Sequence, residues 1–218
     1  QPQFAVQCAI AFGSVVMGRR WVTDRRNFSS LYLLNIGETG SGKEHTKTVL
    51  ETMLEQAGLT DLIGPAGYTS GAGVMSTLIK KPVHVAVVDE LGRQLKAAAA
   101  TGMQHKADAL TSIMECFGRQ DGTLRPQGYS TMTLKSAEAE KLEKFVRRPS
   151  LTLVGMSTPS EFMKAIGGGD VASGLLNRFL IVKSEIGVQL SQRNSVTTIS
   201  DRLAKWANEH AHAHDGDL

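Results

Sequence analysis

The chain has few cysteines and no long apolar run, and these two absences exclude several classes of protein. Cys8 and Cys116 are the only cysteines among 218 residues, and two distant cysteines form neither a disulfide framework nor a zinc-binding motif. A reducing, cytoplasmic environment is therefore expected. No stretch of about 18 or more apolar residues occurs, so we expect no membrane-spanning helix and no membrane partner.

Charge of one sign is not in large excess. The net charge is +3 and charged residues make up 21% of the chain, which is ordinary for a globular protein. This balance alone does not indicate a nucleic-acid-binding protein. A length of 218 residues, of which 41% are hydrophobic, is sufficient for one large domain with a buried core.

The apolar segment 4–17 lacks the pattern of a secretory signal. No basic region precedes it, Gln7 interrupts it, and Arg19 and Arg20 follow it, so we expect a buried helix. Because the chain begins with Gln1, we expect a processed product or a piece of a longer protein. The predicted divisions are an N-terminal helical segment packed on the core (1–30), the core (31–190), and a C-terminal helix with a frayed tail (191–218).

Short apolar runs alternate with helical patterns along the chain, which predicts an α/β fold with a mainly parallel sheet covered by helices. Nearly continuous apolar runs are typical of strands covered on both faces. The predicted strands are residues 31–36, 83–88, 151–155 and 179–182. The predicted helices are residues 4–17, 43–57, 73–79, 107–117, 160–166 and 199–210.

Three further segments carry local predictions. Residues 122–134 alternate Thr, Tyr and Met around Pro126 and predict a β-hairpin, with Arg125 in a surface loop. Residues 97–104 fit either a helix or a connection. His84 lies inside a predicted strand and is expected to be a buried histidine with satisfied hydrogen bonds rather than a catalytic one.

The segment GETGSGK, residues 37–43, follows an apolar strand and precedes a helical pattern, which is the context of a Walker A phosphate loop. Glycines allow backbone geometries in which successive N–H groups turn inward around an anion. The following helix adds its positive N-terminal end, and Lys43 adds a charge for the β- and γ-phosphates. A glycine-rich turn without a ligand is the alternative. The predicted nucleotide-binding residues are Gly37, Glu38, Thr39, Gly40, Ser41, Gly42, Lys43, Glu44 and His45.

One residue departs from this motif. The pattern has Ser or Thr directly after the lysine as a Mg²⁺ ligand, and Glu44 stands there instead. A carboxylate can ligate Mg²⁺ but brings negative charge towards the triphosphate. Thr46, Thr39, Ser41 or water are the other candidate ligands, and a weakened or non-hydrolysing site is the alternative.

An acidic pair ends the strand VHVAVV, at Asp89 and Glu90. In P-loop ATPases the first acid at such a strand end holds Mg²⁺, and the neighbouring acid can activate the attacking water. We assign Asp89 to the metal, together with Glu44, and Glu90 to the water. A third strand ends at Ser157 and Thr158, where a hydroxyl can contact the γ-phosphate or the water; the alternative is a helix N-cap before a proline.

Arg178 precedes the last predicted strand, after a glycine-rich turn. An arginine at such a place can reach a phosphate, and an arginine supplied to a neighbouring subunit stabilises charge in the transition state. This role makes the active unit an oligomer.

Five segments resemble, in order, an uncharacterised ATPase domain of phage, prophage and plasmid proteins that is often joined to primase or replicative-helicase modules. They run from about residue 4 to residue 182 and include GETGSGKEHT, SGAGVMSTLIKKP with VHVAVVDELG, MECFGRQDG, RPSLTLVGMSTPSEF and GGDVASGLLNRFLIV. The resemblance implies a RecA/AAA+-like three-layer P-loop NTPase that acts as a nucleic-acid-dependent motor. It also implies Lys43 at a phosphate, Asp89 and Glu90 as the acidic pair, and Arg178 as an arginine finger.

The expected function is therefore an ATP-hydrolysing motor domain of a mobile-element DNA replication helicase. Its expected ligands are ATP and Mg²⁺, and its expected partners are single-stranded DNA and further copies of the chain. The alternative is a nucleotide-dependent interaction or regulatory module with weak or no hydrolysis. A small-molecule phosphotransferase ranks last, because no lid or acceptor-binding motif is recognisable.

Overall fold

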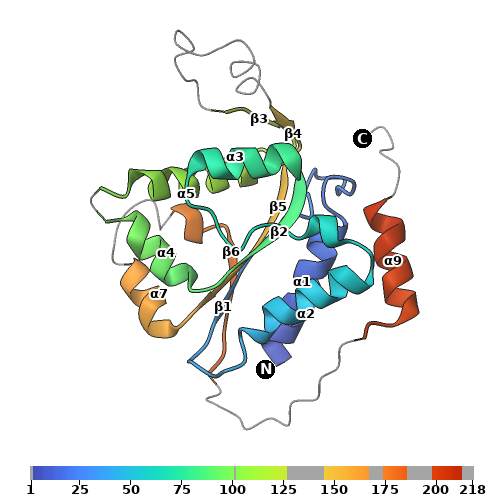
Figure 1. Cartoon of the computed structure of the whole chain (residues 1–218), viewed down its shortest axis with the longest axis horizontal. Helices are drawn as coiled ribbons and strands as arrows, with labels where there is room; N and C mark the ends of the chain where they lie inside the picture. The colour runs from blue at the N-terminus through green and yellow to red at the C-terminus, as the bar shows by residue number, and fades with distance from the viewer. Residues whose placement is uncertain (1, 101, 127–144, 167–173, 186–197, 213–218) are drawn as a thin grey trace.

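A four-stranded parallel sheet forms the centre of the computed structural model, which describes residues 2–100, 102–126, 145–166, 174–185 and 198–212. The strand order is β2-β5-β1-β6, and every neighbouring pair is parallel. The strands are β1 (Tyr32–Ile36), β2 (Val83–Val88), β5 (Ser150–Ser157) and β6 (Phe179–Lys183). The predicted α/β class and all four predicted strands are thus confirmed, because each apolar run is a strand of this sheet (Figure 1).

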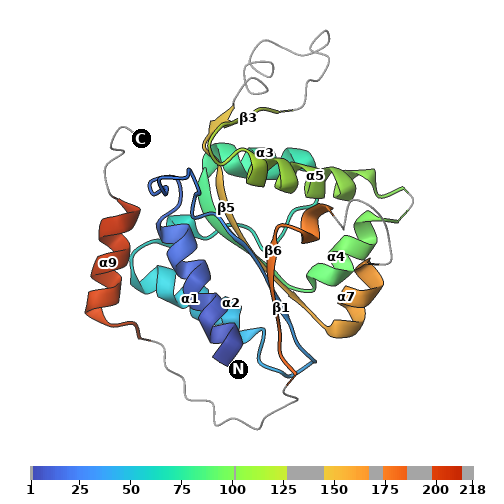
Figure 2. The same ribbon diagram turned by 180° about the vertical axis from the view of Figure 1, so that it is seen from behind.

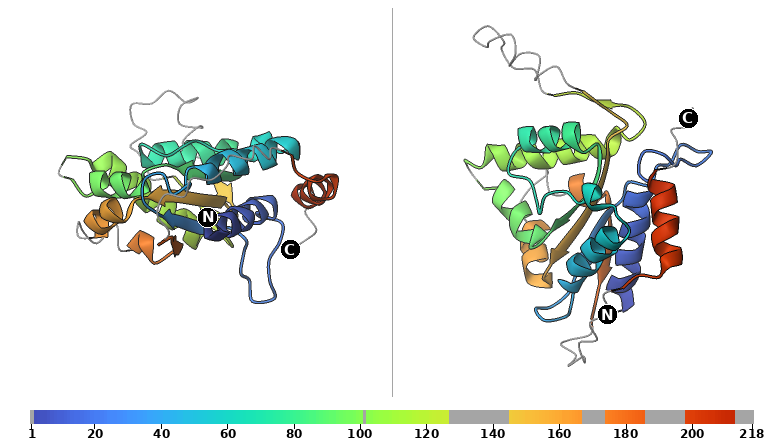
Figure 3. Two further views of the ribbon diagram at one scale, coloured as in Figure 1. Left: turned by 90° about the horizontal axis from the view of Figure 1, so that it is seen from below. Right: turned by 45° about the vertical axis from the view of Figure 1, so that its right-hand side comes forward.

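Helices cover both faces of the sheet, giving three layers (Figures 1–3). They are α1 (Pro2–Val16), α2 (His45–Gln56), α3 (Gly71–Lys80), α4 (Leu91–Ala98), α5 (Gln104–Gly118), α7 (Pro159–Ile166) and α9 (Asp201–Ala211), with a 3-10 turn η1 (Thr60–Leu62). All six predicted helices are present, whereas α4 was not predicted. The undecided segment 97–104 holds the end of α4 and the start of α5.

The two faces of the sheet carry separate apolar cores. Helices α1, α2 and α9 pack on one face, around residues such as Phe12, Leu33 and Leu54. Helices α3, α4, α5 and α7 pack on the other, around residues such as Leu34 and Leu95. Successive side chains of β1, Leu33 and Leu34, point to opposite cores, as the period of a strand requires.

The path between β1 and β2 runs around the edge of the sheet. After α2 and η1, Ile63 pairs with Val85 in parallel and the Gly64 N–H donates to the Val85 carbonyl at 2.8 Å. The chain then returns to β2 through α3, on the opposite face from α2. Between β1 and β2 the chain therefore crosses from the face covered by α2 to the face covered by α3.

A short antiparallel ribbon of β3 (Thr123–Leu124) and β4 (Val146–Arg147) projects from the end of the sheet at the top of Figure 1. Leu124 pairs with Val146 and both are buried. The prediction of a hairpin within residues 122–134 is therefore wrong for β3, whose partner in the described structure is β4. The buried contact of Leu124 with Val146 favours this longer-range pairing. Residues 127–134 lie outside the described part of the chain.

His84 is a fully buried histidine with hydrogen bonds at both ring nitrogens, as predicted. Its Nδ1 lies 2.7 Å from the Lys81 carbonyl, which can only accept, so Nδ1 carries the proton and Nε2 accepts from the Tyr68 hydroxyl. Burial lowers the pKa of His84 from 6.5 to about 4, against the raising effect of the Lys81 carbonyl. The ring is thus neutral at physiological pH.

Acidification is expected to destabilise the protein through His84. Because the folded pKa is below the unfolded value, the stability from the neutral ring is fully present above pH 6.5 and is lost as pH falls towards about 4. This loss amounts to roughly 3 kcal/mol in the free energy of unfolding. Urea unfolding over this pH range should show a flatter profile for His84→Gln, whereas exposed His105→Gln should keep the wild-type slope; a flat wild-type profile would contradict the assignment.

Two expectations about the whole chain can be compared with the structure. Cys8 and Cys116 are both free, as their spacing predicted, and the structure also shows both to be buried. Among the described residues, no helix is both long and apolar enough to cross a bilayer.

Candidate functional site

The carboxyl ends of the parallel strands lie at one edge of the sheet, and most of the predicted site residues follow them. Ile36 pairs with Ser157, and Val88 pairs with Gly155. The chain leaves β1 towards α2 on one face and leaves β5 towards α7 on the other. In open α/β sheets, ligands bind in the crevice outside such a divergence of neighbouring strands. The topology thus places the candidate site at the ends of β1 and β5.

The loop after β1 contains the left-handed backbone conformations that its glycines predicted. Gly40 and Gly42 have φ of 77° and 83°, in the left-handed region that favours glycine. Gly37 is required for space, because a Cβ there would lie 2.5 Å from the Ser41 Oγ and 3.0 Å from the Phe4 Cζ. Phe4 is a buried residue of α1, so the N-terminal helix packs against the loop at Gly37.

Several polar groups of the loop have no protein partner among the residues that the structure describes. The backbone N–H groups of Thr39, Gly40, Gly42 and Lys43 donate to no acceptor there, and the buried Ser41 Oγ also has none. Thr39, Gly40 and Gly42 are exposed and Lys43 is buried, so most of these N–H groups are open to solvent or to a ligand. Consecutive N–H groups beside the start of a helix attract anions. This donor set fits a polyphosphate.

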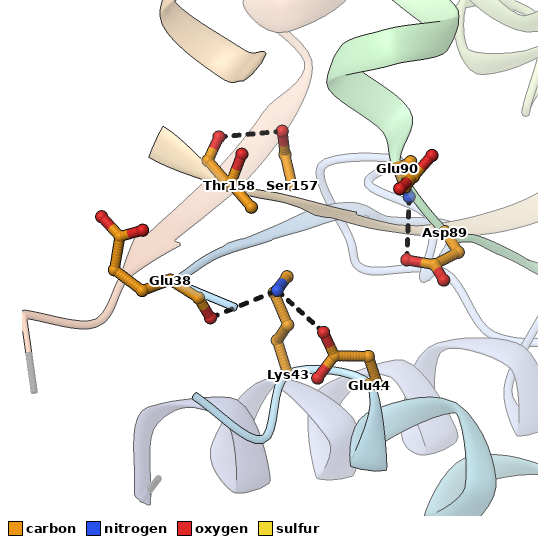
Figure 4. Close-up of polar contacts among 7 residues, drawn as sticks. All are labelled: Glu38, Lys43, Glu44, Asp89, Glu90, Ser157 and Thr158. Atoms are coloured by element: carbon orange, nitrogen blue, oxygen red, sulfur yellow. Dashed lines mark hydrogen bonds and ion pairs between the residues drawn. The ribbon is translucent and has the colours of Figure 1, made fainter. Parts of the chain in front are cut away.

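Lys43 is nearly buried, with 4% of the residue exposed. Its ammonium lies 3.3 Å from the Glu38 carbonyl and 2.8 Å from the Glu44 Oε1 (Figure 4). Partial burial acts to raise the pKa of Glu44, but the hydrogen bond from Lys43, a hydrogen bond from the backbone of Glu44 and the charge of Lys43 together outweigh it, so the pKa is lowered. Glu44 is therefore the counter-ion of Lys43. Because half of its side chain is exposed, the carboxylate has room to turn away from the ammonium.

The hydroxyl groups considered as substitutes for the missing Ser or Thr differ in availability. The Thr46 Oγ1 is buried and accepts from the Asn35 Nδ2 at 3.3 Å, so it faces β1 rather than the loop. Thr39 is exposed. Ser41 is buried inside the loop without a partner in the described structure. Ser41 is the hydroxyl best placed to contact a ligand in the loop.

The acidic pair lies directly after β2, at the same edge of the sheet (Figure 4). The Asp89 Oδ1 accepts from the Glu90 N–H at 2.9 Å. Glu90 begins α4 with φ 51° and ψ 42°, a left-handed conformation that is costly for a residue with a side chain. Such outliers cluster at functional sites. Packing of the next residue stabilises this conformation of Glu90. Leu91 is buried against Gly155 of β5, where a Cβ would lie 2.4 Å from the Leu91 side chain.

Arg93 is a site residue that the sequence analysis missed. Its Nη1 lies 2.5 Å from the Glu90 Oε2, one helical turn along α4. The signal was the spacing of three residues from Glu90, which places two side chains on one helix face. Without α4 among the predicted helices, this spacing carried no information.

The predicted Mg²⁺ ligands remain predictions. Among the described residues, no cluster of three or more His, Cys, Asp or Glu side chains suits a metal ion. Mg²⁺ at nucleotide sites uses one or two carboxylates together with phosphates and water. Asp89 and Glu44 are of the right chemistry for that arrangement.

Ser157 ends β5 and Thr158 follows it, and β5 lies between β1 and β2 in the sheet, so both residues lie between the phosphate loop and the acidic pair (Figure 4). The Thr158 Oγ1 accepts from the Glu161 N–H at 3.3 Å and its carbonyl accepts from the Phe162 N–H at 3.0 Å, so Thr158 caps α7. The N-cap alternative is therefore what the structure shows. A threonine hydroxyl that accepts still has its own proton to donate, so a contact with a ligand stays a prediction.

Arg178 is not brought to this site. It precedes Phe179, which pairs with Tyr32 at the amino end of β1, at the other end of the sheet from Lys43. Its guanidinium donates to the Gly174 carbonyl and lies 6.0 Å from the centre of the Phe117 ring. Arg178 therefore does not reach the phosphate loop of its own chain, and a role as a finger in the site of another subunit stays a prediction.

No protein-family model, curated protein or solved structure matches this chain. The resemblance to mobile-element ATPase domains thus remains a prediction from sequence motifs.

Proposed function

We propose that the chain is a P-loop NTPase of the RecA/AAA+-like type, which binds ATP with Mg²⁺ outside β1 and β5 and hydrolyses it. The observation that carries this proposal is the loop of unpartnered N–H groups around the nearly buried Lys43, at the divergence of two parallel strands. The triphosphate group of ATP is an anion that such a loop of N–H groups can bind. The wider role is that of a motor domain of a mobile-element DNA replication helicase.

Phosphate binding is assigned to the loop and the start of α2. The N–H groups of Gly40, Gly42 and Lys43 surround the phosphates, and the Lys43 ammonium contacts the β- and γ-phosphate oxygens after Glu44 turns away. Mg²⁺, when bound, neutralises charge on these oxygens. Asp89 and Glu44 are the residues that would hold it.

Glu90 is assigned to the attacking water. A carboxylate at this position accepts a proton from water in line with the γ-phosphate. Before it acts, Glu90 has to part from Arg93, and both side chains are more than half exposed. Exposed ion pairs are weak, so this release costs little. Thr158, on the strand between, supplies a hydroxyl donor to the same region.

Single-stranded DNA is expected to stimulate ATP turnover. A motor couples hydrolysis to its track, so the steady-state rate should rise several-fold when an unstructured oligonucleotide is added. The stimulation should weaken as salt rises, because phosphate contacts release counterions. A coupled phosphate-release assay across a salt series measures both effects. Identical turnover with and without DNA at every salt concentration would remove the motor from the proposal and leave the ATPase.

A regulatory module with slow or no hydrolysis is the second candidate, and the Lys43–Glu44 ion pair favours it. If this pair inhibits the site, Glu44→Ser should free the ammonium, supply a hydroxyl ligand, and raise Mg²⁺-dependent turnover by tenfold or more. If Glu44 takes part in catalysis, as proposed above, the same variant should lower turnover. Exposed Glu55→Ser on the same helix is the matched control and should change nothing. The direction of the change in rate decides between the two candidates.

A further inference from the structure

The β3–β4 ribbon lies at the opposite end of the sheet from the phosphate loop and carries an unusual set of exposed side chains (Figures 1 and 2). Phe145, directly before β4, is 48% exposed. The guanidinium carbons of Arg125 and Arg147 lie 5.8 Å and 5.7 Å from the centre of its ring. One open aromatic ring is thus accompanied by two exposed cations.

The ribbon holds these three side chains on one surface. Leu124 and Val146 pair with each other and are buried in the core, so their neighbours along each strand point outwards. The Arg148 N–H donates to the Gly122 carbonyl at 2.7 Å and closes the base of the ribbon. The outward surface of Arg125, Phe145 and Arg147 is called the ribbon surface below.

A basic loop from the N-terminal part of the chain is attached beside the ribbon. Arg26 makes two hydrogen bonds to Asp121, at 2.5 Å and 2.6 Å, and the Gln120 Nε2 donates to the Ser30 carbonyl at 3.0 Å. Segments 19–26, 119–125 and 145–148 together contain eight arginines and two aspartates. The whole chain has a net charge of only +3, so positive charge is concentrated at this end.

The same region holds unusual backbone. Among the described residues, four that are not glycine have positive φ, and three of these are arginines of the basic segments: Arg19 (66°), Arg26 (59°) and Arg148 (45°). The fourth is Glu90 of the acidic pair. Left-handed backbone persists where surrounding structure enforces it, and it clusters at ligand sites.

We propose that the ribbon surface binds single-stranded nucleic acid. A base stacks on the Phe145 ring, and Arg125 and Arg147 contact the flanking phosphates. Every base has a flat face, so this mode needs an open aromatic ring and nearby cations rather than a particular sequence. The bases of a duplex are already stacked on each other, so a duplex offers the arginines its phosphates but leaves Phe145 without a partner. The inference locates the DNA partner of the proposed function, yet binding here requires no nucleotide in the phosphate loop.

The test is fluorescence anisotropy of a labelled oligothymidylate of about 20 nucleotides, titrated with the full chain in the absence of ATP. Phe145→Ala is expected to weaken binding about tenfold or more, and Phe145→Leu equally, because an apolar but non-aromatic side chain cannot stack. Phe145→Trp should retain affinity, and its added fluorescence should be quenched by the oligonucleotide. Arg147→Ala should reduce the salt slope of binding by about one.

Matched controls are Met163→Ala, which removes another exposed apolar side chain, and Arg202→Ala, which removes an exposed cation from α9. Both should bind as the wild type does. An oligouridylate run in parallel shows whether RNA binds with the same dependence on Phe145. The inference is overturned if Phe145→Ala and Phe145→Leu bind like the wild type, or if duplex DNA and heparin bind as tightly as the single strand.

The failure of this inference can be separated from failure of the proposed function. Phe145→Ala should bind ATP with wild-type affinity, because the ribbon and the phosphate loop lie at opposite ends of the sheet. A wild-type protein that binds ATP but no oligonucleotide would overturn the inference and leave the nucleotide site standing. A protein that binds the oligonucleotide through Phe145 but binds no ATP would support the inference and contradict the proposed nucleotide site.

Discussion

Replacing Lys43 with alanine is expected to weaken ATP binding roughly 100-fold, because hydrogen bonds to charged groups are worth about 1.5–3 kcal/mol each and one ammonium makes several of them to the phosphates. Lys43 is nearly buried, and a neutral water molecule in its place would not supply the positive charge. A titration with a fluorescent ATP analogue in the presence of Mg²⁺ measures the effect. Lys205→Ala removes the same charge from an exposed position on α9 and should bind like the wild type.

The Lys43→Ala variant should remain folded, which makes the loss of binding interpretable. Its only ion-pair partner in the described structure, Glu44, is half exposed and can be solvated once the lysine is gone. Thermal unfolding followed by circular dichroism should give a transition close to that of the wild type. Wild-type affinity in a folded Lys43→Ala variant would refute the assignment of Lys43 to the phosphates.

Glu90→Gln is expected to retain ATP binding and to lower turnover by about 10²–10⁴-fold, the usual contribution of a positioned general base. The amide has the size of the carboxylate but cannot accept the proton from the attacking water. The left-handed backbone of Glu90 is enforced by Leu91 and Gly155 rather than by its own side chain, so the local fold should persist. Single-turnover and steady-state phosphate release, with binding measured in parallel, separate the two effects.

Glu161→Gln is the matched control for Glu90→Gln. Glu161 forms an exposed ion pair with Lys164 three residues further along α7, the same arrangement as Glu90 with Arg93. Loss of this pair should leave turnover unchanged. Equal losses in both variants would indicate a general effect of removing surface charge, and unchanged turnover in Glu90→Gln would assign the base to another residue.

The sheet could be predicted because parallel strands covered on both faces need almost uniformly apolar side chains. Residues 83–88 are all buried in β2, and the apolar run in the sequence has the same ends. Strand order could not be predicted in this way, since the chain visits β2 before β5 although β5 lies beside β1. The hydrophobic pattern of a strand does not identify its neighbours.

The sequence predicted in part which site residues lie close together. Lys43, Asp89 and Thr158 all follow predicted strands, and carboxyl ends of parallel strands meet at one edge. Arg178 instead precedes its strand and lies at the opposite end of the sheet, although the sequence analysis placed it within reach of a phosphate. The position of a residue before or after a parallel strand was therefore the useful signal.

Other features depended on contacts that no local pattern contains. Helix α4 has two apolar residues one turn apart, Leu91 and Leu95, and is stabilised by packing on β5 and α7 rather than by a long amphipathic repeat. The pairing of Leu124 with Val146 joins residues that lie far apart in the sequence. The ion pair between Lys43 and Glu44 was not anticipated, because neighbouring residues of a helix start rarely face each other.

Isothermal titration calorimetry of the unmodified chain with ATP and Mg²⁺ near neutral pH tests the central claim most directly. If unpartnered N–H groups and the Lys43 ammonium hold a triphosphate, the titration will give a saturating heat with one site per chain, and AMP will compete poorly. Absence of heat from both ATP and GTP at any accessible concentration would contradict the account.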